Sequence, residues 1–245
     1  MYERLKAIAK KAIPPKLLHR YEAELRGVNA LLYVGNKVRC NCCGGSFAKW
    51  ITLTNGDRLC PKCGSLPRTR RLYDTLLHGY LGKDVRVLHF SPSVTLRRRL
   101  SQTVGLLYDS TDYAGEFQAR YQFDILDIAM PPDTYDLVIC YHVLEHITDD
   151  RRAMAELYRV LKPGGRALIQ TPFQDGAIYE DDTIITPEAR LAAFGQTDHV
   201  RVYSVAGLAG RLRDAGFGVE VKRFGDDEVA GLRGGEVVLA CRKPW

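Results

Sequence analysis

Short apolar runs alternate with helix-like segments between residues 85 and 242. Four runs of five or six residues stand at 85–90, 104–108, 137–141 and 166–171, and a closing pair stands at 219–224 and 236–242. Residues 150–161 and 204–215 instead carry apolar side chains at helical spacing. Strands and helices in alternation predict an α/β fold, with a doubly wound and mostly parallel sheet.

Residues 1–37 carry a different pattern, in which apolar side chains recur at helical spacing between charges. The pattern predicts a helical segment, broken at Pro14-Pro15, that lies against the main domain. Attachment to a membrane surface or to nucleic acid remains open, because residues 1–31 hold seven Lys or Arg against three Glu. The apolar positions of this segment are Leu17, Leu18, Tyr21, Leu25 and Val28.

Four cysteines at residues 38–66 stand in two identical pairs. Cys40 and Cys43 are separated by two residues, sixteen residues follow, and Cys60 and Cys63 repeat the pattern. Two such pairs predict a tetrahedral, structural zinc site in a zinc-ribbon module, since four thiolates leave no coordination position open. Cys42 is an alternative ligand inside the first pair. The module is expected to dock or cover a neighbouring domain, and RNA binding is the alternative.

The remaining composition adds few constraints. The chain has 245 residues, a net charge of +6 and 46% hydrophobic residues, which is typical of a globular protein. It contains no apolar run long enough to span a bilayer and no secretory signal at its start, so we expect a cytoplasmic protein. We expect three parts: residues 1–37, the zinc ribbon at 38–66, and a main domain at 67–245. The sequence carries no signal for oligomeric state.

Three motifs in the main domain resemble those of class I S-adenosylmethionine (SAM)-dependent methyltransferases. Tyr135–Ile147 resembles their fourth strand and its following loop, and Met154–Gly165, which ends in Leu-Lys-Pro-Gly-Gly, resembles their next helix and turn. His199–Ser204 with Ala215-Gly216-Phe217 resembles their late loop and last helix. The resemblance covers roughly residues 85–242. It is closest to bacterial members that carry an amino-terminal zinc ribbon and a segment like Phe194–Arg201, and it implies SAM as cofactor.

The resemblance also implies where the cofactor binds. Ligands of open parallel sheets lie beyond the carboxyl ends of the strands. We expect Asp112 to accept the ribose hydroxyls, with Asp109 as the reserve. Asp124, twelve residues before Asp136, matches the family position that accepts the adenine amino group, beside the Ile125 N–H. The remaining expected cofactor contacts are His89, Phe90, Ser91, Tyr141 and His142.

The first loop departs from the family, because residues 87–93 contain no glycine where methyltransferases usually have several. Either SAM binds a different loop here or binding has been lost. The downstream motifs favour retained binding.

Four residues are candidates for the chemistry. His142, at the end of the fourth strand, and His199, in the late loop, are candidate general bases. Glu145 and His146 are further candidates that also suit a purely structural turn. The spacing His142-x-x-Glu145-His146 has two further interpretations. One is a divalent metal site, since some relatives hold a metal through Glu-x-x-Glu-His. The other is an inverted zinc-protease signature. The protease interpretation is disfavoured because the segment follows a strand.

These features predict a methyltransferase that acts on a small-molecule or glycan-like acceptor. The polar segment 174–198, with three consecutive carboxylates at 180–182, is expected to be an irregular lid over the acceptor. An RNA methyltransferase that docks RNA through its zinc ribbon is the first alternative. A methyltransferase-like protein that binds a partner without catalysis is the second.

Overall fold

The computed structural model describes residues 26–115 and 118–245 and divides the chain into two compact units. The first unit is Met1–Tyr80 with Phe224–Glu236, and the second is Leu81–Arg223 with Val237–Trp245. Most of the predicted amino-terminal helix lies outside the described residues. Its described end is helical at 26–30 and continues as the 3-10 turn η1 (Leu31–Tyr33).

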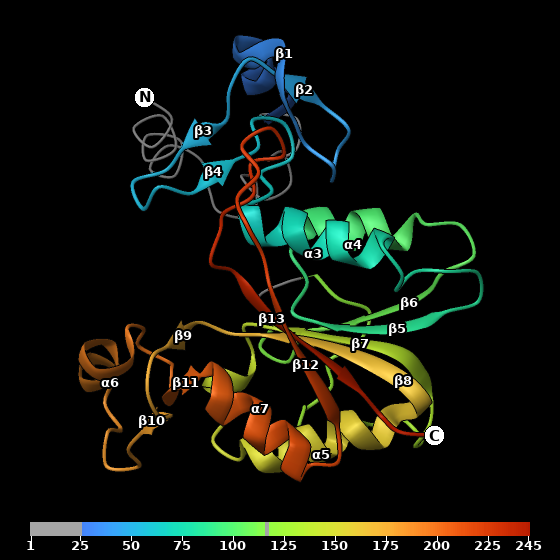
Figure 1. Cartoon of the computed structure of the whole chain (residues 1–245), viewed down its shortest axis with the longest axis vertical. Helices are drawn as coiled ribbons and strands as arrows, with labels where there is room; N and C mark the ends of the chain where they lie inside the picture. The colour runs from blue at the N-terminus through green and yellow to red at the C-terminus, as the bar shows by residue number, and fades with distance from the viewer. Residues whose placement is uncertain (1–25, 116–117) are drawn as a thin grey trace. The chain divides into compact units, whose positions relative to one another are not determined.

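A six-stranded mixed sheet organises the second unit, as Figure 1 shows. Four strands are parallel, and the last two form an antiparallel hairpin that joins the sheet beside β8. The α/β class is therefore confirmed, with a mixed sheet that keeps its predicted parallel half. In spatial order the strands are β12 (Gly218–Arg223), β13 (Val237–Arg242), β8 (Leu161–Gln170), β7 (Tyr135–Tyr141), β5 (Arg86–Phe90) and β6 (Leu107–Thr111).

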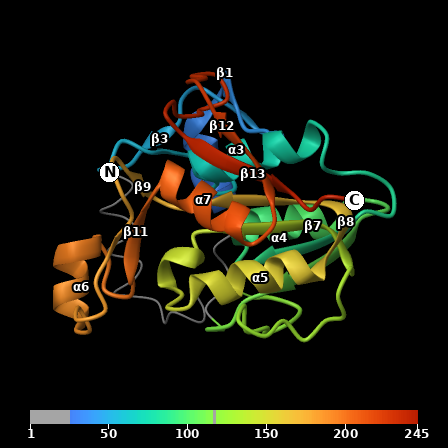
Figure 2. The same cartoon turned by 60° about the horizontal axis from the view of Figure 1, so that its bottom comes forward.

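The core of the second unit lies between this sheet and two helices, α5 (Asp150–Val160) and α7 (Val205–Asp214). These helices lie side by side on one face of the sheet in Figures 1 and 2, and α4 (Val94–Ser101) lies on the other. Apolar side chains from β7, α5 and α7 meet in one buried cluster. Burial of this continuous apolar surface is the main stabilising contribution here.

Two predicted elements of the second unit were wrong in their details. The second strand begins at Leu107 instead of Val104, because Gly105 (φ +78°) makes a turn that leaves Val104 98% exposed. The segment expected to be irregular contains strands β9 (Phe173–Gln174) and β10 (Tyr179–Glu180) and helix α6 (Pro187–Phe194). The Thr186 hydroxyl caps this helix by accepting from the Ala189 N–H at 3.2 Å.

The first unit has little regular structure among its described residues. The first cysteine pair lies between the strands of one short hairpin, the second pair follows another hairpin, and the helix α3 (Pro67–Leu77) comes next. The division differs from the predicted boundaries, since the unit continues to Tyr80 and also takes in residues 224–236, between β12 and β13. The hairpins pair β1 (Val34–Arg39) with β2 (Ser46–Phe47) and β3 (Ile51–Thr52) with β4 (Arg58–Leu59).

The two parts of the first unit are joined by the buried side chain of Arg70 on α3. Its guanidinium stacks 4.2 Å from the centre of the Trp50 ring and donates to backbone carbonyls on three segments. Because all of these acceptors lie in the first unit, Arg70 ties residues 224–236 to the cysteine module. The acceptors are Ser65 (2.5 Å), Arg58 (2.7 Å), Gly231 (2.6 Å) and Ala230 (2.9 Å).

Candidate functional site

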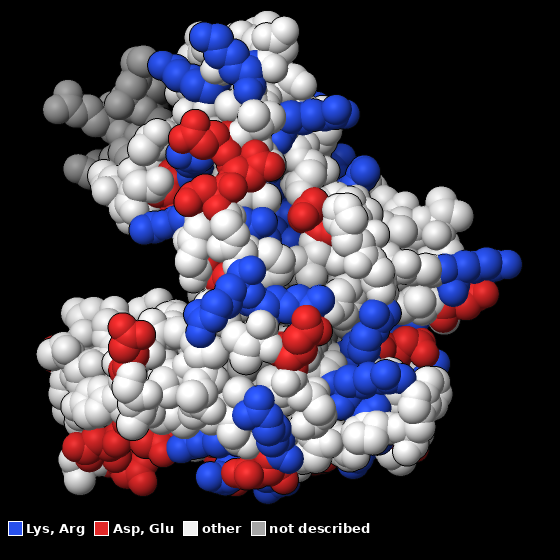
Figure 3. Space-filling model, viewed as in Figure 1, with Lys and Arg blue, Asp and Glu red and all other residues white. Residues whose placement is uncertain are grey.

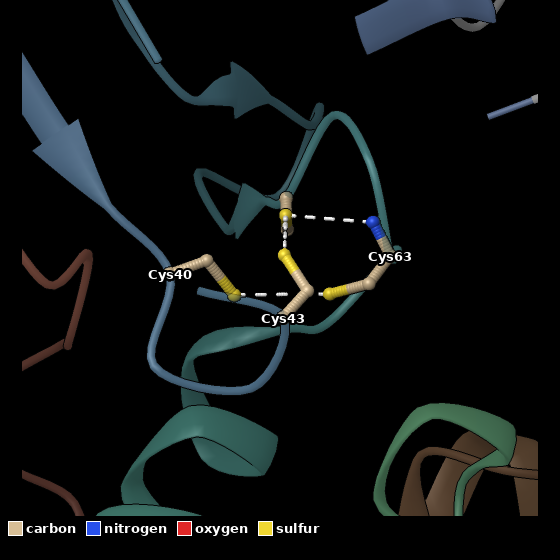
Figure 4. Close-up of side chains that lie close together, drawn as sticks. Cys40, Cys43 and Cys63 are labelled. Carbon is tan, nitrogen blue, oxygen red and sulfur yellow. Dashed lines mark hydrogen bonds between the residues drawn. The ribbon is translucent and has the colours of Figure 1, made fainter. Parts of the chain in front are cut away.

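The four predicted zinc ligands converge at one point of the first unit, and Figure 4 shows Cys40, Cys43 and Cys63 turned toward one another. The Sγ atoms of Cys40 and Cys63 are 3.7 Å apart, and those of Cys43 and Cys60 are 3.8 Å apart. A zinc ion with Zn–S bonds of about 2.3 Å requires Sγ atoms about 3.8 Å apart at the corners of its tetrahedron. These two distances match a zinc tetrahedron, and all four Sγ atoms lie within 4.8 Å of one another.

The backbone around the cysteines explains the spacing. The N–H of Gly44 donates to the Cys40 carbonyl at 2.8 Å, with φ of +69° at the glycine, and Gly64 repeats the turn with Cys60 at 3.0 Å and +71°. Side chains other than glycine rarely adopt this conformation. Cys42 does not join the group, because its Sγ points to the Thr69 carbonyl at 3.9 Å.

The second candidate site lies at the carboxyl ends of β5, β6, β7 and β8 in the second unit. Ser91 directly after β5 and His142 directly after β7 both have positive φ, at +43° and +55°. Such conformations cost free energy in residues other than glycine and cluster at functional sites. Ser91 thus gives the first loop the backbone conformation that a glycine would otherwise provide.

The two candidate ribose carboxylates lie in different surroundings. Asp112 follows β6 and accepts a hydrogen bond from the Ser91 hydroxyl at 2.8 Å. Asp109 lies in the middle of β6, where Arg86 and Arg120 hold its carboxylate at 3.1 Å and 2.8 Å. These ion pairs occupy Asp109 within the strand, whereas Asp112 stands at the sheet edge where the cofactor is expected.

The predicted adenine contacts are brought next to Asp112. The Asp112 N–H donates to the Tyr121 carbonyl at 3.2 Å, so the segment that contains Asp124 and Ile125 runs beside the end of β6. Asp124 accepts from the Leu126 N–H at 2.8 Å, and the Ile125 side chain is buried in the core. Only the backbone of Ile125 is therefore available to a ligand.

His89, Phe90 and Tyr141 are placed differently from the other predicted contacts. His89 is 2% exposed within β5, where the Tyr108 hydroxyl lies 3.0 Å from its Nδ1, and burial lowers the pKa of His89 to about 3. The Phe90 side chain belongs to the apolar core. The structure thus keeps His89 and the Phe90 side chain inside the fold, while Tyr141 ends β7 beside the site.

A histidine–carboxylate pair stands at the end of β7. The Nδ1 of His142 lies 3.3 Å from Oε1 of Glu145, whose side chain is 1% exposed. Burial alone would raise the pKa of Glu145, but the contact with His142 and nearby donors outweighs it, so this pKa is lowered. With Nδ1 facing a carboxylate, Nε2 is the ring nitrogen that can accept a proton. This Nε2 is buried without a hydrogen-bond partner among the described residues.

Gln170 and Thr171 were not predicted as site residues. Gln170 ends β8 beside β7 and Thr171 follows it, and the His142 N–H donates to the Gln170 carbonyl at 2.9 Å. Gln170 Oε1 and Thr171 Oγ1 are buried without hydrogen-bond partners in the described parts of the chain. The signal available in the sequence was the polar pair Gln-Thr directly after an apolar strand.

The late loop brings two histidines and an aspartate to the same place. The rings of His146 and His199 meet edge to face at 4.7 Å, and Asp198 lies 3.1 Å from Nδ1 of His146. Burial, and the neighbouring His146, lower the pKa of His199. Potential ligand atoms of Glu145, His146 and His199 all lie within 4.8 Å of one another. All four predicted catalytic candidates therefore share one corner of the second unit.

A cavity of about 610 Å³ lies in the second unit, and none of the four catalytic candidates lines it. Thr148 and Val200 line it, each one or two residues beyond a candidate catalytic histidine, together with residues of the segment that holds β10 and α6. Five carboxylates and four arginines share its wall. Residues 174–198 were expected to cover the acceptor, but Arg201 and Arg211, which hold this segment, were not predicted.

Those side chains form an ion network around Asp150. The Asp150 carboxylate accepts from Arg211 at 2.6 Å and from the Tyr203 hydroxyl at 2.5 Å. Glu180 of β10 pairs with Arg201 at 2.8 Å and also with Arg211. Hydrogen bonds from Arg211 lower the pKa of Glu180 to about 2. The network therefore ties β10 to α5 and α7.

Comparison with known proteins identifies the second unit. A family model described as a methyltransferase domain matches residues 78–221. A probable S-adenosylmethionine-dependent methyltransferase of Mycolicibacterium smegmatis is 30% identical over 161 residues, which cover 61% of this chain and 57% of that protein. One of Mycobacterium tuberculosis is 29% identical over 122 residues, which cover 47% and 40%. The chain thus spans only about half the length of these curated relatives.

Solved structures agree on the fold. Phosphoethanolamine N-methyltransferase 2 of Haemonchus contortus has a TM-score of 0.51 at 16% identity and matches over 83% of this chain and 56% of its own. The 1,6-didemethyltoxoflavin N1-methyltransferase of Burkholderia thailandensis has a TM-score of 0.50 at 19% identity, over 73% and 80%. No helix in the described part of this chain is long and apolar enough to span a membrane. With more than half of its length matched by the family model, the chain belongs to the SAM-dependent methyltransferases.

Proposed function

We propose that this enzyme transfers the methyl group of SAM to a small-molecule or glycan-like acceptor. The observation that supports the proposal is a cavity of about 610 Å³ lined by Thr148 and Val200, which follow His146 and His199 closely in the chain. Pockets of about 300–1,000 Å³ are typical of small-molecule sites. Carboxylates slightly outnumber arginines on its wall, which disfavours a polyphosphate such as RNA.

The cofactor would lie along the ends of β5, β6 and β7. Asp112, held by Ser91, is placed to accept ribose hydroxyls, and the Asp124–Ile125 backbone is placed to meet the adenine. The positive φ of Ser91 replaces the missing glycine of this loop, which supports retained binding. When bound, SAM supplies an electrophilic methyl group on a sulfonium.

The protein's own contribution to the reaction would be alignment and proton removal. Among the two predicted bases, His142 is better placed than His199, because Glu145 faces its Nδ1 and leaves Nε2 as the proton acceptor. The buried oxygens of Gln170 and Thr171 would orient polar groups of the two substrates in the same corner.

Cofactor binding is tested by calorimetric titration with SAM and S-adenosylhomocysteine. Asp112→Asn should weaken binding of both at least tenfold, since a carboxylate accepts two hydroxyl hydrogens better than an amide does. Asp175→Asn, an exposed aspartate of the same unit, serves as the matched control and should bind as the wild type does. Equal affinities for the two variants would remove Asp112 from the site.

Acceptor class is tested with methyl-labelled SAM and a cell extract. Label should appear in small-molecule or glycan fractions and be unaffected by ribonuclease, and His142→Gln should reduce it by about 10²-fold or more. Label found in ribonuclease-sensitive material would overturn the proposal in favour of an RNA acceptor docked by the cysteine module. Label found nowhere, with SAM bound, would favour a binding protein without catalysis.

A further inference from the structure

We propose that Glu145, His146 and His199 bind a divalent transition-metal ion at a site separate from the cysteine cluster. Their potential ligand atoms, one carboxylate oxygen and two imidazole nitrogens, all lie within 4.8 Å of one another. Two ligands come from the 3-10 turn η2 (Leu144–His146) and the third from the late loop. The Val200 N–H donates to the Glu145 carbonyl at 2.9 Å and so holds the two segments together.

The state of the Glu145 carboxylate is an independent observation that points to a cation. Its side chain is 1% exposed, and neither oxygen has a hydrogen-bond partner among the described residues beyond the 3.3 Å contact of Oε1 with His142. A buried carboxylate whose neighbours form no well-aligned hydrogen bond with it is costly unless a positive charge compensates it. A divalent ion at this position would compensate it.

The neighbours of the two histidines suit coordination. Metal-binding histidines usually donate their second ring N–H to a carboxylate or carbonyl, which fixes the ring. Asp198 lies 3.1 Å from Nδ1 of His146 and can play that part while the other nitrogen coordinates. The edge-to-face contact with His199, at 4.7 Å between ring centres, brings the two imidazoles next to each other.

The donor set selects the kind of metal. Imidazole suits zinc, iron and similar ions, and the single carboxylate also suits manganese, whereas four thiolates strongly prefer zinc. Three protein ligands leave positions open, as in catalytic metal sites. If the enzyme acts as proposed above, an acceptor oxygen could take one of these positions. Metal binding itself does not depend on that function.

This ligand set differs from the one that the sequence spacing suggests. The spacing alone places His142 with Glu145 and His146, whereas the structure puts His199 in the group and leaves His142 outside it. His142 instead contacts Glu145 from the side of β7. The two ligand sets therefore make opposite predictions for His142 and His199.

To test the site, full-length protein supplied with Zn²⁺ is titrated with Mn²⁺. Binding is measured by calorimetry and by electron paramagnetic resonance. Mn²⁺ competes poorly for thiolates, so the cysteine cluster should stay loaded. One Mn²⁺ should bind per chain and raise Tm. His199→Ala, His199→Gln and Glu145→Gln should each weaken binding at least tenfold and abolish the rise in Tm.

Two controls make the result decisive. His142→Gln should keep Mn²⁺ affinity within about threefold, and so should His78→Ala, a histidine on the surface of the first unit. Binding of S-adenosylhomocysteine, measured in parallel, reports whether each variant is folded and whether the proposed methyltransferase site is intact. If the protein binds this nucleoside but not Mn²⁺, the metal site alone is overturned. The same holds if His142→Gln loses Mn²⁺ binding while both His199 variants retain it.

Discussion

The two units of this chain are stabilised in different ways. The second unit has a six-stranded sheet and a continuous apolar core between β7, α5 and α7. The described part of the first unit has two short hairpins, the helix α3, a helical turn at residues 26–33, a cluster of four thiols and a buried guanidinium. The difference teaches that apolar burial stabilises the second unit, whereas a few specific contacts stabilise the first unit.

Loss of the predicted zinc should give the largest effect, and it should act on the first unit alone. Cys60→Ser, or treatment with a strong chelator, removes binding free energy that amounts to about 10 kcal/mol in structural zinc sites. Hydrogen exchange measured by mass spectrometry should rise throughout residues 34–66 and 224–236 and stay slow at β7. Cys140→Ala, a buried cysteine of the second unit, is the control. Equal increases in both units would show that their stabilities are not separate.

Removal of the buried guanidinium should give the next largest effect. Arg70→Met leaves several backbone carbonyls of the first unit without their donor, and breaking such a buried charged network costs about 3–5 kcal/mol. We expect faster hydrogen exchange at residues 224–236 even with metal present. Arg68→Met, an exposed arginine on the same helix, should change nothing measurable. Unchanged protection in the Arg70 variant would mean that the metal alone holds this segment.

Acid should weaken the second unit through His89. Its folded pKa of about 3 lies below the usual 6.5 because burial disfavours the charged ring. Below pH 6.5 the unfolded chain therefore binds a proton that the folded chain does not. As the pH falls from 6.5 to about 3, the free energy of unfolding decreases by about 1.4 kcal/mol per pH unit. His89→Phe should reduce the change of the urea unfolding midpoint between pH 7 and pH 5. The exposed His78→Phe should keep the wild-type slope, and an identical slope in His89→Phe would refute the assignment.

The smallest effect is expected at the segment that covers the cavity. The lowered pKa of Glu180 means that its contribution is present above about pH 4.5 and is lost as the pH falls toward 2. Because its side chain is 37% exposed, Glu180→Gln should cost less than about 1 kcal/mol. Proteolysis within residues 174–198 at pH 7 should be several-fold faster, whereas the exposed Glu188→Gln should match wild type. Equal rates would show that α6 is held by apolar contacts.

Local pattern in the sequence determined much of this protein. The two cysteines of each pair stand three positions apart beside a tight turn at glycine, and this spacing predicted that the four thiols lie together. Apolar runs between helical segments predicted the sheet, because each pattern reflects which face of an element is buried. The strand from Leu107 was misplaced since a turn at Gly105 interrupts the apolar run that contains Val104.

Only the tertiary structure decided which distant residues meet. Arg70 binds the carbonyl of Ala230, 160 residues away, and His199 joins Glu145 and His146 across the whole of α5 and β8. The left-handed backbone at Ser91, which stands in for a glycine, is imposed by the end of β5 and has no signature in composition. Such contacts depend on the order and register of strands in the sheet, which no short stretch of sequence encodes by itself.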